Sequence, residues 1–338
     1  MERIRFIVEQ LEECRKLIQK RSKSHYRMAF TLLDNTVEIL MYRATRHHLE
    51  MDEMIEVMHQ RAKAVMPPKE YAKWAANSQL KVVGRKTRRA IDRHYPEKVR
   101  YLAGVKKVPE PLAATIGHLH DYRNEMYHRD RVQEDVLRSL TVFLFELACE
   151  IFVILRPDGY TSLSPGEEES HGWRRFNRTY ALTMANVFGE QGFSDVARKV
   201  KGGLSISIFK LRRSLKRHLR DRIQQAIENV TTVRDDALGR MSLNKALKEL
   251  QFIEGGHARR PSSYKRDLKC YEPKFSMVDF RRWRKTINGL DKIHDKCELF
   301  NAFAVVESDF RKCESVVDQA AMHVDQMIQQ QIDIARGK

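Results

Sequence analysis

The chain has 338 residues, of which 42% are hydrophobic and 32% charged, and its formal net charge is +17. This length allows two globular domains with buried cores. No apolar run approaches the roughly 20 residues needed to span a bilayer, and the charged N-terminal stretch MERIRFIVEQLEECRK is unlike a signal peptide. Five scattered cysteines without C-x-x-C spacing are typical of reduced thiols, so we expect a cytoplasmic protein that does not enter a membrane.

Hydrophobic periodicity predicts three helices in the first 65 residues. Residues 3–20 form an amphipathic helix with one apolar face, and residues 24–48 form a second one. Asp34 and Glu38 lie close to the apolar stripe of the second helix. A third helix, residues 50–65, should end before Pro67-Pro68, because consecutive prolines favour extended backbone.

A basic run follows, with ten Lys or Arg residues between Lys81 and Lys107 against two carboxylates. One interpretation is a solvated charged face, which is the ordinary role of such a run. The other is a track for the phosphate backbone of RNA. The candidate RNA-binding residues in this run are Arg85, Arg88 and Arg89.

The stretch HLHDYRNEMYHRD lies on a helix predicted over residues 111–131. The apolar face of this helix comprises Leu112, Ile116, Leu119 and Met126, and Arg123 projects into the middle of that face. On the adjacent flank, His120, Asn124 and His128 follow one another at four-residue spacing.

Arg123 needs a partner, because its guanidinium stays charged and would be very costly to bury alone. A structural salt bridge to Asp34 or Glu38 would satisfy it, and so would a bound phosphate or a partner chain.

Residues 132–155 are apolar nearly all round, which predicts a buried helix that packs antiparallel to the helix at 111–131. Residues 157–172 contain prolines, glycines and an acidic cluster and are predicted to be a linker. We therefore expect an all-α protein with a helical domain at residues 1–156 and a second, mostly helical domain at residues 173–338.

The second half carries most of the positive charge: residues 170–338 have 33 basic and 20 acidic residues, against 29 and 25 in residues 1–169. Such a basic half favours a polyanion partner. In the segment KLRRSLKRHLRDRI, three leucines are predicted to face inward, which places these candidate RNA-binding residues outward: Arg213, Lys216, Arg217 and Arg220.

Two other features of this half have open interpretations. HARRPSSYKRDLK, residues 257–269, is predicted to be a basic loop. Trp283 lies among arginines, as in a stacking site for single-stranded nucleic acid, but a core Trp with a charged rim fits equally. His294, Cys297 and Cys313 match no zinc spacing, so we expect no metal site.

The sequence Arg123-Asn124-x-x-x-His128 resembles the R-x4–6-H motif of HEPN ribonucleases, in which a polar residue, often Asn, follows the Arg. The early helix phrase AFTLLDNTVEIL and the long apolar helix after the motif fit the same family. The resemblance covers roughly residues 1–155 and implies a HEPN-like helical bundle there.

This resemblance implies a metal-independent endoribonuclease without a cofactor, in which the RNA 2′-OH attacks the adjacent phosphate. His128 would transfer protons, Arg123 would stabilise charge on the phosphate, and Asn124 would position the imidazole or the phosphate. The products would carry 2′,3′-cyclic phosphate and 5′-OH ends. Arg123 and His128 lie about 140° apart on an ideal helix, which fits the family habit of pairing two motif helices across a homodimer.

Other functions remain open. One is a non-catalytic HEPN-like protein that binds RNA or nucleotides. Another is a toxin or anti-phage effector restrained by an antitoxin or regulatory protein. Toxins paired with nucleotidyltransferase-type antitoxins carry Tyr two residues after the His, where this chain has Asp130, so that subgroup is disfavoured.

Overall fold

The computed structural model describes residues 2–77, 83–129, 134–156, 171–180, 190–239, 241–255 and 264–336. These residues are mostly helical and contain no strand, which confirms the predicted all-α class. None of the described helices has both the length and the hydropathy that crossing a membrane requires.

The chain divides into two compact units, Met1–Ser207 and Ile208–Lys338, and this boundary lies after the linker predicted at residues 157–172. Residues 157–170 of that linker lie outside the described ranges.

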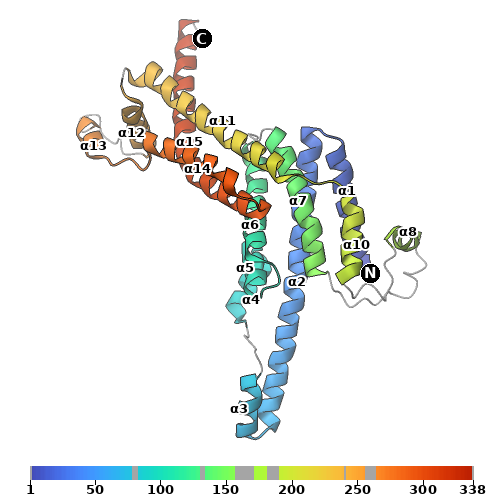
Figure 1. The fold of residues 1–338 in the computed structure, drawn as a ribbon. Coiled ribbons are helices and arrows are strands. Elements are labelled where there is room, and N and C mark those ends of the chain that lie inside the picture. The colour runs from blue at the N-terminus through green and yellow to red at the C-terminus, as the bar shows by residue number, and fades with distance from the viewer. Residues whose placement is uncertain are drawn as a thin grey trace. The chain divides into compact units, whose positions relative to one another are not determined.

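The described helices of the first unit are drawn in blue to yellow-green (Figure 1). In chain order they are α1 (Glu2–Gln19), α2 (Lys23–Val65), α3 (Pro68–Asn77), α4 (Arg85–Arg93), α5 (Tyr95–Gly104), α6 (Glu110–Arg129), α7 (Glu134–Leu155), α8 (His171–Tyr180) and α10 (Glu190–Lys201).

Helix α2 is a single helix of 43 residues, where the sequence predicted two helices that meet near residue 49. No proline or glycine occurs at that point, so the backbone hydrogen bonds continue across it. The Ser22 side chain accepts a hydrogen bond from the His25 amide and caps the start. The helix ends at Val65, and Met66 is extended before Pro67, as predicted.

Helix α7 is the central element of the first unit. Nearly every residue from Val136 to Cys149 is buried, as its all-round apolar sequence predicted. However, α7 packs mainly against α2, α10 and α1 (Figure 1). Helix α6 packs instead against α5 and α2, which corrects the predicted antiparallel pairing of α6 with α7. A helix without a polar face needs cover on several sides, which a single neighbour could not supply.

Helices α8 and α10 belong to the first unit, and polar contacts hold both of them to α1. Arg15 Nη1 donates to the carbonyl oxygens of Lys199 and Val200 at 3.2 and 3.0 Å. Tyr180 Oη donates to Glu12 Oε1 at 2.5 Å. Gly202 has a φ of +51°, which favours glycine, and a Cβ there would lie 2.4 Å from Arg15 Nη1, so a larger residue would have to displace the Arg15 side chain.

The second unit begins with the long helix α11, and α14 and α15 are drawn in red (Figure 1). In chain order its elements are α11 (Ile208–Val233), the π-helical turn η2 (Arg234–Leu238), α12 (Leu243–Glu254), α13 (Tyr264–Cys270), α14 (Met277–Gly289), the 3-10 turn η3 (Leu290–Lys292) and α15 (Lys296–Ala335).

Helix α13 was not expected, because the sequence predicted a loop at residues 257–269. Tyr264 anchors it to α12: its hydroxyl donates to Glu249 at 2.6 Å, and its ring packs edge-on against Phe252. Tertiary packing therefore stabilises a helix of seven residues that would not form alone.

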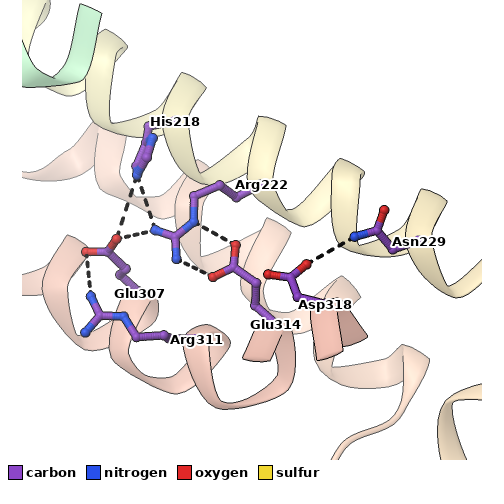
Figure 2. A network of polar contacts seen from close by, with 7 residues as sticks. All are labelled: His218, Arg222, Asn229, Glu307, Arg311, Glu314 and Asp318. Atoms are coloured by element: carbon purple, nitrogen blue, oxygen red, sulfur yellow. Dashed lines mark hydrogen bonds and ion pairs between the residues drawn. The ribbon is translucent and has the colours of Figure 1, made fainter. Parts of the chain in front are cut away.

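Charged side chains join α11 to α15 in the core of the second unit (Figure 2). Arg222 on α11 donates through Nε and Nη2 to the two oxygens of Glu314, at 2.9 and 2.6 Å, and its Nη1 contacts Glu307. The buried His218 lies beside the same guanidinium, with Nε2 3.2 Å from Arg222 Nη1. Arg311 contacts the other oxygen of Glu307 at 3.7 Å.

Trp283 lies in the hydrophobic core and not on an exposed stacking surface. Only 2% of it is exposed, and its Nε1 donates to Asp309 Oδ2 at 2.9 Å. Its ring packs against Phe280 and Phe310, with centroids 5.2 Å away in both cases. The core interpretation of this Trp is therefore confirmed.

Candidate active site

Arg123 on α6 forms an ion pair with Asp34 on α2. Its Nε lies 3.2 Å from Asp34 Oδ2, and Asp34 is 2% exposed. Its Nη1 donates to Asn124 Oδ1 at 2.9 Å. The buried carboxylate of Asp34 holds one side of the guanidinium, and the Arg123 side chain still reaches the surface because 28% of it is exposed. Asp34 is one of the two carboxylate partners that the sequence predicted.

His120 shares the same carboxylate, a contact that the sequence did not predict. Its Nδ1 lies 3.1 Å from both oxygens of Asp34. A carboxylate can only accept a hydrogen bond, so Nδ1 carries the proton and Nε2 is the acceptor in the neutral ring. Asp34 therefore orients His120 as a carboxylate orients the base in many hydrolytic sites. The only signal in the sequence was the spacing of His120 four residues before Asn124.

Tyr95, the first residue of α5, completes this cluster. Its ring stacks on the His120 ring with centroids 4.2 Å apart and an interplanar angle of 29°. Burial, and then the nearby carboxylates of Asp34 and Glu38, raise the pKa of the Tyr95 hydroxyl well above its ordinary value. This hydroxyl is buried and has no hydrogen-bond partner among the described residues. No sequence pattern indicated Tyr95, because only the packing of α5 on α6 places it there.

Helix α2 also supplies a second guanidinium next to the motif. Arg27 Nη2 donates to the carbonyl oxygen of Met126 at 3.3 Å. Arg27 and Asp34 lie seven residues apart, which is two helical turns, and so project from one face of α2. Between them Phe30 packs against Tyr122 of α6, with ring centroids 6.2 Å apart. These contacts hold the motif helix in a defined register on α2.

His128 is placed on α6 by its backbone, but its side chain lies outside the described residues. The structure thus brings Arg123 and Asn124 together and leaves the third predicted catalytic residue on the same helix, four residues after Asn124. The helix ends at Arg129, directly after it.

The three candidate RNA-binding arginines of α4 differ from one another. Arg85 and Arg89 are exposed, as a phosphate track requires. Arg88 pairs with Glu53 at 2.7 Å and Glu56 at 3.4 Å on α2, and its side chain is 16% exposed. Arg88 therefore ties α4 to α2, which favours a structural role for this residue.

Helix α11 presents the other predicted basic surface. Arg213, Arg217 and Arg220 are exposed, as predicted. Lys216 is largely covered, because it pairs with Asp291 at 2.6 Å and its side chain is only 12% exposed. Arg220 Nη2 also donates to Asn288 Oδ1 at 2.6 Å. Lys216 and Arg220 lie four residues apart on α11, and their contacts join α11 to η3 and to the antiparallel helix α14.

A hollow of about 700 Å³ opens on this surface. The side chains that line it are mostly basic and include Phe209, which is 73% exposed and lies under the Arg212 guanidinium. Its other lining residues are Arg212, Arg213, Lys216, Arg217, Arg220, Asp221 and Asp291. An exposed aromatic ring among arginines is suited to stack a base while the guanidinium groups bind phosphates.

Among the described residues, no group of three or more His, Cys, Asp or Glu side chains is arranged to hold a metal ion. This chain matches no protein-family model, no curated protein and no solved structure.

Proposed function

We propose that this protein is a metal-independent endoribonuclease that cleaves RNA through attack by the 2′-OH on the adjacent phosphate. The observation that carries the proposal is that Arg123 and His120 both contact the buried carboxylate of Asp34, while Arg123 also donates a hydrogen bond to Asn124. The spacing of Arg123, Asn124 and His128 on the motif helix resembles the R-x4–6-H motif of HEPN ribonucleases, and His120 lies outside that motif.

Arg123 is suited to stabilise charge on the phosphate. A guanidinium offers planar donors that match phosphate oxygens, and it acts best when it is oriented before the substrate arrives. Asp34 and Asn124 provide that orientation from two sides. We infer that the partly exposed end of Arg123 binds the phosphate whose ester bond breaks.

His128 would remove the proton from the 2′-OH or return one to the leaving 5′ oxygen. The reaction needs both steps, and two motif helices from a homodimer would supply two such groups. His120 offers another route, because Asp34 leaves its Nε2 as the acceptor. We propose His128 as the catalytic residue and His120 as a second candidate for one of the two proton transfers.

The test is an assay with a 5′-labelled RNA in excess EDTA. We expect cleavage of RNA and not of the matched DNA, with products that carry 2′,3′-cyclic phosphate and 5′-OH ends. His128→Ala should abolish cleavage, whereas His118→Ala, on the same helix, should retain it. Loss of wild-type cleavage in EDTA that a divalent ion restores would overturn the mechanism.

A second function is favoured by the basic hollow on α11. A chain that captures RNA with Phe209 and the surrounding arginines would need no chemistry at α6. In that case the wild-type protein would bind RNA and leave it intact, with the same result for His128→Ala. The two functions are thus separated by the same assay.

A further inference from the structure

A second cavity, of about 230 Å³, lies in the first unit between α2, α4 and α5. These three helices pack against one another (Figure 1). The residues of this cavity that matter here are Tyr42, Thr45 and Arg46 of α2, Arg89 and Asp92 of α4, and Lys98 of α5. None of them belongs to the cluster around Asp34.

Lys98 is a buried cation in the cavity wall. It is 4% exposed, and its Nζ donates to the carbonyl oxygen of Asp92 at 2.9 Å. The ammonium also lies 5.8 Å from the centre of the Tyr42 ring. Among the described residues no carboxylate oxygen comes within 4.0 Å of it, although buried ammonium groups are normally paired with one. An anion in the cavity would supply the missing charge.

Thr45 adds a buried donor to the same wall. It is 3% exposed, and its Oγ1 has no hydrogen-bond partner among the described residues. Buried helical threonines elsewhere in the chain donate to the carbonyl four residues earlier: Thr36 does so to Leu32 at 2.7 Å, and Thr115 to Pro111 at 2.8 Å. Thr45 departs from this pattern, which leaves its hydroxyl for a ligand in the cavity.

Two other cations of the cavity already have carboxylate partners. Arg46 contacts Glu50 at 3.1 Å, and Arg88 contacts Glu53 at 2.7 Å. Lys98 and the exposed Arg89 therefore provide the positive charge for a ligand.

We propose that this cavity binds a small phosphomonoester, with the phosphate at Lys98 and Thr45 and the organic group against the Tyr42 ring. A phosphate has several acceptor oxygens, which suits an ammonium and a hydroxyl that both lack partners of the usual kind. The cavity volume limits the organic group to a small one. This proposal does not rest on ribonuclease activity.

The test is a calorimetric titration of the full chain with inorganic phosphate and with phenyl phosphate at constant ionic strength. We expect both ligands to bind, phenyl phosphate more tightly because its ring adds contact with Tyr42. Lys98→Met should weaken both by at least about tenfold, as loss of a charged hydrogen bond does. Thr45→Val, which keeps the shape of the side chain, should weaken both by about fivefold.

Thr115→Val is the matched control, since it removes a buried helical hydroxyl outside the cavity and should leave both affinities unchanged. Thr45→Val should fold normally because its hydroxyl bonds to no described residue, so the test survives if Lys98→Met fails to fold. Equal phosphate affinity in the wild type and Thr45→Val would overturn the proposal. The proposal would also be overturned if the wild-type protein, at a concentration of about 1 mM, bound neither ligand at an approximately tenfold molar excess of that ligand. RNA cleavage is not a readout here, so failure of this proposal is distinguishable from failure of the ribonuclease proposal.

Discussion

The Nε atom of Arg123 lies 3.2 Å from Oδ2 of Asp34, a carboxylate that is almost fully buried. One helix thus supplies the cation and another, nearly ninety residues earlier, supplies the anion. Removing one partner of an ion pair with a buried charge strongly destabilises the folded protein, because the other charge is left without a partner. The same contact also sets the direction of the guanidinium. It therefore contributes both to the stability of the first unit and to the orientation of Arg123 on the motif helix.

Asp34→Asn should destabilise the protein by about 3 kcal/mol, because Arg123 and His120 both lose their carboxylate. The measurement is urea unfolding followed by circular dichroism. Asp121→Asn, at an exposed position of α6, is the control and should change stability by less than about 0.5 kcal/mol. The double variant Asp34→Leu with Arg123→Met should be more stable than Asp34→Asn, because it leaves no unpaired Arg123 charge. A less stable double variant would show that the unpaired charge is not the cause of the destabilisation in Asp34→Asn.

Arg123→Lys tests the proposed phosphate contact. Lysine keeps the charge and loses the planar set of donors. We expect cleavage to fall by about a hundredfold, as when one donor to a transition-state oxyanion is lost. RNA binding in a His128→Ala background should fall much less. Full activity in Arg123→Lys would contradict the proposed role of the planar guanidinium donors in cleavage.

Tyr95→Phe should leave stability unchanged or raise it by about 1 kcal/mol, because the buried hydroxyl has no hydrogen-bond partner among the described residues. The contrasting variant is Tyr180→Phe, which loses the bond to Glu12 and should be destabilised by about 1 kcal/mol. Thermal unfolding compares the two. A destabilised Tyr95→Phe would mean that the hydroxyl is satisfied in the folded protein.

The basic face of α11 predicts a salt-dependent interaction with RNA. Arg213→Ala with Arg217→Ala should weaken RNA binding for all sequences and flatten the log–log salt dependence by about 1.4, at about 0.7 per lost phosphate contact on a single strand. Lys216→Ala with Arg220→Ala should also lower stability, because both side chains bond α11 to the segment from Asn288 to Asp291. Binding measured by fluorescence anisotropy at several salt concentrations tests this. An unchanged slope in the first double variant would exclude this face from the RNA surface.

The second unit should lose stability in acid through Glu307. Burial by itself would raise the pKa of this carboxyl, but His218, Arg222 and Arg311 lower it from 4.5 to about 2. Because the folded pKa is depressed, the stabilising effect is complete above about pH 4.5 and is lost as the pH falls toward 2. We expect the urea midpoint of wild type to fall across this window and that of Glu307→Gln to fall less. Glu228→Gln, exposed on α11, should behave like wild type.

The sequence by itself determined the all-α class and the buried faces of several helices. The stripe of α1, the apolar face of α6 and the all-round burial of α7 follow from which side chains recur at helical spacing, a local property of the chain. The leucines of α11 are buried and Trp283 is in the core, as the same reasoning indicated. Local pattern also placed Arg123 and Asn124 next to each other and named Asp34 as a possible partner.

Only the tertiary structure decided which of these elements meet. The packing of α6 on α2 and α5 pairs Arg123 with Asp34, gives His120 the same carboxylate and places Tyr95 against the His120 ring. The packing of α11 against α14 and η3 covers Lys216, which its helical position had predicted to be exposed. Periodicity defines a face of a helix, but the partner of that face comes from another part of the chain, and its choice depends on the packing of the whole unit.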